Sequence, residues 1–98
     1  MVTAFVLMNI ERGKINEVAQ RALGIEGIAE VFSVAGEFDL IAILRTASNE
    51  QIADIVTGHL LDIPYIVRSE TMLAFRAFSK DDLGAAFALG SDEPALRE

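Results

Sequence analysis

Apolar residues along the chain switch between two periodicities, and the switches divide residues 1–78 into six elements. Residues 3–10 are apolar at almost every position and are closed by a turn at Gly13, which is typical of a strand. Over residues 14–23 the apolar positions recur at helical spacing, and Gly24 is well placed as the C′ residue. These helical apolar positions are Ile15, Val18, Ala19, Ala22 and Leu23.

The second half of the chain repeats this order. Residues 28–34 and 40–44 predict two strands, and the connection between them is too short for a parallel crossover, so we expect an antiparallel hairpin. Ser48 is a good N-cap, and Gln51 completes a capping box. The helix that follows is stopped by Pro64. Its apolar stripe consists of Ile52, Ile55, Val56, His59 and Leu60.

A fourth strand is predicted within residues 66–78, and it completes the order strand–helix–strand, strand–helix–strand. The apolar core of this strand is Met72, Leu73, Ala74, Phe75 and Phe78. The order predicts an α+β, ferredoxin-like βαββαβ fold, in which two helices cover one face of a four-stranded antiparallel sheet. We expect residues 1–78 to form this domain and residues 79–98 to be an acidic, partly helical tail. The first half of the tail either docks on a neighbouring subunit or is a frayed terminus, and we expect disorder from Ser91 on. Gly58 inside the second helix predicts close packing against the sheet.

The predicted strands carry apolar residues on both faces, although a sheet with one solvated face should alternate apolar and polar positions. Phe5 and Leu7 lie on the opposite face of the first strand from Val6 and Met8, and residues 40–44 show the same pattern. An uncovered apolar face indicates an interface. We therefore expect a homodimer that stacks sheet on sheet, a dimeric α+β barrel.

Composition and charge exclude several classes of function. The net charge of −7 and the lack of a Lys/Arg cluster argue against direct nucleic-acid binding. The absence of cysteine excludes a disulfide scaffold and makes a reducing cytoplasm the default location. The apolar start of the chain is too short to be a membrane span and lacks the basic residues of a signal peptide.

Residues with catalytic potential are few. His59 is the only histidine, and a metal site needs a cluster of ligands, so no metal, cofactor or catalytic residue is expected. Gly36 and Asp39 permit two interpretations. They are either ordinary turn residues, or a pair that holds a small zwitterion, with backbone amides on its carboxylate and Asp39 on its ammonium.

The segment Val34-x-Gly36-x-Phe38-Asp39-Leu40, followed by an apolar strand, resembles the hallmark of the effector-binding (RAM) domain of the Lrp/AsnC transcriptional regulators. The resemblance extends over residues 2–78, and the helix-turn-helix half of those regulators has no counterpart in the sequence. It implies dimers that assemble into octamers or decamers and bind an amino acid between dimers. Carried over by position, the ligand-binding residues would be Val34, Ala35, Gly36, Glu37, Phe38, Asp39, Ser69 and Thr71.

The first hypothesis is therefore a stand-alone, non-enzymatic module that senses an amino acid, and that either co-assembles with a full-length Lrp/AsnC-type regulator or simply binds amino acids. One alternative is a small dimeric ferredoxin-like enzyme of the cofactor-free monooxygenase type. Its chemistry would use His59, with Asn9, Ser33 and Arg76 as polar pocket residues. Another alternative is a purely structural assembly domain.

Overall fold

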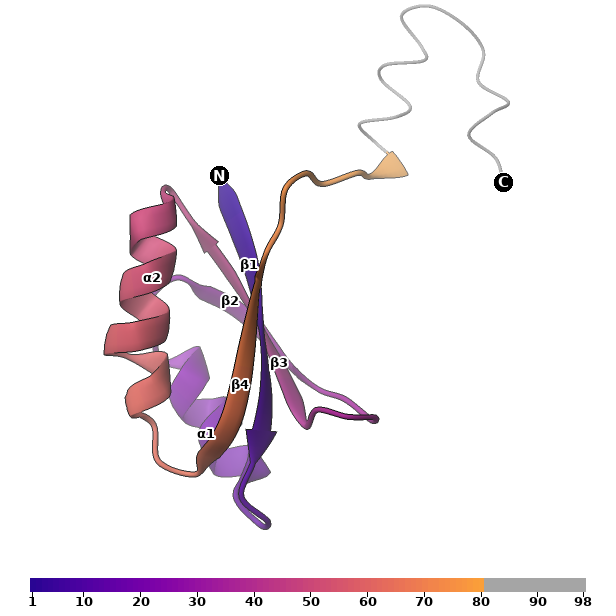
Figure 1. Ribbon diagram of the computed structural model, residues 1–98, viewed down its shortest axis with the longest axis vertical. Helices are drawn as coiled ribbons and strands as arrows, with labels where there is room; N and C mark the ends of the chain where they lie inside the picture. Colours follow the sequence, from indigo (N-terminus) through magenta and orange to yellow (C-terminus); the bar gives the residue numbers. More distant parts are fainter. Residues whose placement is uncertain (81–98) are drawn as a thin grey trace, which may run out of the picture.

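Four strands form one antiparallel sheet in the order β2-β3-β1-β4, and two helices lie on one face of it (Figure 1). This arrangement is seen in a computed structural model that describes residues 1–80. The strands are β1 (Val2–Ile10), β2 (Ile28–Ser33), β3 (Leu40–Thr46) and β4 (Ile66–Leu73); the helices are α1 (Ile15–Leu23), α2 (Asn49–Gly58) and a 3₁₀ turn, η1 (Leu60–Asp62). The predicted ferredoxin-like fold is confirmed.

The central strands β1 and β3 have apolar residues on both faces, as the sequence indicated. Ala4, Val6 and Met8 are fully buried under the helices. Phe5 and Leu7 point to the other face, where they remain half-buried beside Ile43 and Ile41 of β3. Because no element of residues 1–80 covers this second face (Figure 1), we call it the open face.

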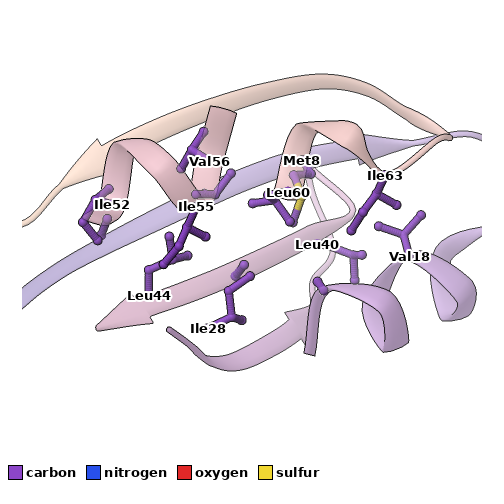
Figure 2. Packing of buried hydrophobic residues seen from close by; sticks show 14 of the residues in the cluster. Met8, Val18, Ile28, Leu40, Leu44, Ile52, Ile55, Val56, Leu60 and Ile63 are labelled. Atoms are coloured by element: carbon purple, nitrogen blue, oxygen red, sulfur yellow. The ribbon is translucent and has the colours of Figure 1, made fainter. Parts of the chain in front are cut away.

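The helix-covered face holds the hydrophobic core. Val18 and Ala22 of α1 are buried, and Ile52, Ile55 and Val56 of α2 pack against the same sheet. Figure 2 shows side chains from the helices and from the sheet meeting in one layer. The labelled members of this layer are Met8, Val18, Ile28, Leu40, Leu44, Ile52, Ile55, Val56, Leu60 and Ile63.

Ser48 caps helix α2 as predicted, but the reciprocal bond of the capping box and the end of the helix differ from the prediction. Ser48 Oγ accepts from Gln51 N at 3.2 Å, but Gln51 Oε1 accepts from Ala47 N at 2.8 Å, so the capping box reaches one residue further back than expected. The helix ends at Gly58, well before Pro64, because His59 leaves helical geometry at φ −133°. The expected close packing of Gly58 is wrong, since a Cβ built there meets nothing within 4 Å.

Strand β4 ends earlier than predicted. It stops at Leu73, and the last backbone bond on this edge runs from Ala74 N to Thr3 O. Phe75 is fully exposed and Phe78 is 73% exposed, so the expectation that they belong to the strand's apolar core is wrong.

The expected tail falls almost entirely outside the described residues, which reach only two positions into residues 79–98. Its predicted helix and its predicted disorder stay predictions. Across residues 1–80, none of the helices has the length and apolar character needed to cross a bilayer.

Candidate functional site

The turn between β2 and β3 presents open backbone at the end of the hairpin. Gly36 has φ +127°, a conformation that favours glycine, and a Cβ built there would meet nothing within 4 Å. Ala35, Gly36 and Glu37 are exposed, and a bond of 3.0 Å from Val34 N to Asp39 O closes the turn behind them. The amides of this turn are therefore accessible to a ligand.

Asp39 anchors the turn to the neighbouring strand. Its backbone N donates to Met8 O at 2.9 Å, and its carboxylate Oδ2 accepts from Ile10 N at 2.8 Å. This contact spans 29 residues of sequence, so Asp39 is more than the local turn cap that its position suggested. Within residues 1–80, Oδ1 accepts no hydrogen bond, which leaves one carboxylate oxygen for a ligand.

Two residues outside the predicted site also hold the turn. Asn9 Nδ2 donates to Glu37 O at 2.8 Å. Arg68 of β4 makes an ion pair with Glu37 at 3.3 Å and stacks over the Phe38 ring, 4.9 Å from its centroid. Arg68 reaches the turn because it is the register partner of Asn9, so only the strand pairing could have identified it.

Ser69 and Thr71 do not join the turn within one chain. They lie on β4, opposite Met8 and Val6 of β1. Because Met8 and Val6 are buried under the helices, both β4 residues belong to the helix-covered face. Ser69 is half-buried, Thr71 is exposed, and no hydrogen bond in residues 1–80 connects either to residues 34–39. Their part in a pocket with residues 34–39 stays a prediction.

The polar residues of the enzyme alternative are not gathered around His59. His59 is the C-cap of α2 and lines a cavity of about 650 Å³, whose lining does not include Asn9, Ser33 or Arg76. Ser33 and Asn9 instead lie near the Gly36 turn, and Arg76 is exposed beyond β4. In the described part of the chain, no group of three His, Cys, Asp or Glu residues could hold a metal ion.

Comparisons with known proteins converge on one family. The family model for the Lrp/AsnC ligand-binding domain matches residues 3–83. A helix-turn-helix-type transcriptional regulator of Pyrococcus furiosus, itself uncharacterised, is 36% identical over 76 residues. That match covers 74% of this chain and 51% of the regulator, so the chain spans about half the length of this relative.

Solved structures share the fold. A protein of Thermus thermophilus is 36% identical with a TM-score of 0.77, and the match covers 82% of this chain and 100% of that one. A feast or famine regulatory protein of M. tuberculosis, solved in complex with L-methionine, is 22% identical with a TM-score of 0.69. That match covers 83% of this chain and 54% of the other, and it supports the fold alone.

Proposed function

Because the chain belongs to the Lrp/AsnC family, we propose that it is an oligomeric module that binds a small amino acid at contacts between subunits and acts on transcription through a partner regulator. Regulators among its relatives support the regulatory role. The observation that carries the proposal is the open turn at Gly36, which lies beside the fixed carboxylate of Asp39. The proposal involves no catalysis.

The turn has complementary groups for both ends of an amino acid. The exposed backbone at Ala35, Gly36 and Glu37 offers N–H donors to a carboxylate. The carboxylate of Asp39 is held in place by the hydrogen bond that Oδ2 accepts from Ile10 N. Its other oxygen, Oδ1, can accept a hydrogen bond from an ammonium group. The M. tuberculosis relative binds L-methionine, which makes this amino acid the first ligand to test.

The open face supplies the contact for a second subunit. Cross-strand pairing places Phe32, Ile41 and Leu7 in one row and Ile43, Phe5 and Met72 in the next, and Phe32 and Met72 remain about half exposed. A contiguous exposed apolar patch often marks an interaction site. We therefore place the dimer contact here. The dimers then assemble into octamers or decamers, in which Ser69 and Thr71 of one subunit complete the turn of another.

Effector binding changes regulation only if the ligand prefers one assembly over another. A ligand held between subunits meets this condition, because its pocket exists only where the subunits are in contact. The free energy of ligand binding then also stabilises the assembly that contains the pocket.

Sedimentation velocity on two matched variants tests the dimer contact. Ile43→Glu places a charge in the open face, whereas Leu23→Glu places the same charge at an exposed position of α1. The proposal expects the wild type and Leu23→Glu to be dimers or larger and Ile43→Glu to be a monomer. A wild-type chain that is monomeric at micromolar concentration contradicts the proposal.

Thermal denaturation in the presence of each of the twenty amino acids tests effector binding. Asp39→Asn keeps an oxygen that accepts from Ile10 N but removes the negative charge, so it should fold and lose the response. Asp62→Asn, the same change on η1, is the control and should respond like the wild type. A wild-type protein whose melting temperature no amino acid raises would contradict amino-acid binding.

A further inference from the structure

The turn between β2 and β3 carries a row of amides without partners. Val34 N donates to Asp39 O at 3.0 Å and Asp39 N donates to Met8 O at 2.9 Å, so both ends of the turn are closed by backbone hydrogen bonds. Between these bonds, no N–H group of residues 35–38 donates to any group within residues 1–80. Successive free N–H groups bind an anion when the backbone holds them in a suitable conformation. The contacts that hold this turn are therefore part of the site.

Asn9 fixes the direction of one peptide group in this turn. It lies near the end of β1, and its side chain is on the open face, because the neighbouring Met8 is buried under the helices. Asn9 Nδ2 donates to Glu37 O at 2.8 Å, a contact across 28 residues of sequence. Across a trans peptide bond, the C=O of one residue and the N–H of the next point in opposite directions. The hydrogen bond from Asn9 therefore directs the N–H of Phe38 away from β1 and leaves it free.

Arg68 holds a side chain that would otherwise compete with a bound carboxylate. Glu37 lies within the row of free amides and carries a negative charge of its own. Arg68 Nη2 pairs with Glu37 Oε2 at 3.3 Å, and its guanidinium stacks over the Phe38 ring, 4.9 Å from the centroid. Without this partner, the Glu37 carboxylate would be free to accept from the amides of its own turn and would repel another anion there. Arg68 both neutralises this carboxylate and holds it on the side of β4.

We propose that Asn9 and Arg68 are positioning residues of the Gly36 turn. Asn9 orients the amides of residues 35–38, and Arg68 keeps the Glu37 carboxylate off them, so the turn is ready for a ligand carboxylate before binding. The two residues act together because they are register partners on β1 and β4. A site that is ordered in advance loses less free energy to ordering when it binds. The inference rests on the proposed function, since it concerns the same turn.

Measurement of ¹⁵N relaxation on the ligand-free protein tests the role of Asn9. The wild type should show backbone order parameters of about 0.85 at residues 35–38, as in rigid backbone, and Asn9→Ala should lower them to about 0.6 or less. Asn16→Ala, the same change at an exposed position of α1, is the control and should leave them unchanged. A wild-type turn that is already flexible, or an Asn9→Ala turn as rigid as the wild type, overturns the role of Asn9.

Calorimetric titration with L-methionine tests the consequence for binding. Asn9→Ala should weaken binding by about threefold to tenfold, the effect of one neutral hydrogen bond. Arg68→Met should weaken it by roughly fivefold, the effect of one uncompensated charge at contact distance in water. The double variant Arg68→Met/Glu37→Gln should recover this loss, because the competing charge is gone, whereas a merely structural role of Arg68 predicts no recovery. Arg76→Met, at an exposed position beyond β4, is the control and should bind like the wild type.

The two measurements separate the failure of this inference from the failure of the proposed function. If an amino acid binds the wild type and all variants equally, the proposed function stands and both positioning roles are overturned. If Arg68→Met binds more weakly but the double variant does not recover, the role assigned to Arg68 is overturned. If no amino acid binds the wild type, the proposed function fails, and the order parameters alone confirm or refute that Asn9 orders the turn.

Discussion

Removing the Asp39 carboxylate should destabilise the fold through a single contact. Asp39 Oδ2 accepts from Ile10 N at 2.8 Å, and Ile10 is a buried residue at the end of β1. A hydrogen bond to a charged group contributes roughly 1.5–3 kcal/mol, and Asp39→Ala leaves the part-buried amide of Ile10 without this partner. We therefore expect Asp39→Ala to lower the free energy of unfolding by about 2 kcal/mol, or the melting temperature by roughly 8–16 °C in a domain of this size.

Asp39→Asn removes the negative charge of the side chain but keeps an oxygen that can accept a hydrogen bond. The amide oxygen still accepts from Ile10 N, so the loss should stay below about 1 kcal/mol. Glu37→Gln is the neighbouring control, because it disturbs only the exposed ion pair with Arg68, which contributes at most about 1 kcal/mol. Urea unfolding at one fixed protein concentration measures all three variants. An Asp39→Ala variant that unfolds like the wild type, or an Asn variant as unstable as the Ala variant, would refute the proposed contribution of this hydrogen bond.

Three further predictions concern backbone conformation. Tyr65 has φ +83°, a conformation that is strained for a residue with a Cβ. Tyr65→Gly should therefore be more stable than Tyr65→Ala by about 1–2 kcal/mol in urea unfolding. The opposite order of stability would show that the backbone at residue 65 is not strained. Gly27→Ala adds a Cβ at φ +100° against Ile55 and should cost about 1–3 kcal/mol, whereas an unchanged unfolding midpoint would mean that the turn rearranges freely. Gly58→Ala, at the end of α2 with open space around it, should raise stability by roughly 0.5–1 kcal/mol, and a lower melting temperature would show that Gly58 is constrained.

Most of the fold follows from residue patterns, because the switch from strand to helix periodicity is strong in this chain. The error at the end of β4 has a physical cause. Apolar residues continue through Phe78, but β1 begins at Val2, so residues beyond Ala74 have almost no strand left to pair with. An apolar pattern predicts where a strand is able to form, and the length of its partner decides where it ends.

The candidate site was only partly predictable for a similar reason. Gly36 and Asp39 are marked by local turn chemistry, and the structure places them at an open turn. The anchoring of Asp39 to Ile10 and the approach of Arg68 to Glu37 depend on strand register, which the sequence alone does not contain. Ser69 and Thr71 stay a prediction, because no hydrogen bond within residues 1–80 connects them to the turn.

The most direct test of amino-acid binding is a crystal structure of the full chain grown with L-methionine. The proposal predicts density for the amino acid at a subunit contact, with its carboxylate on the amides of residues 35–37 and its ammonium within hydrogen-bond distance of Asp39 Oδ1. Methionine bound elsewhere, or a turn that is empty at saturating methionine and with every other amino acid, would contradict it.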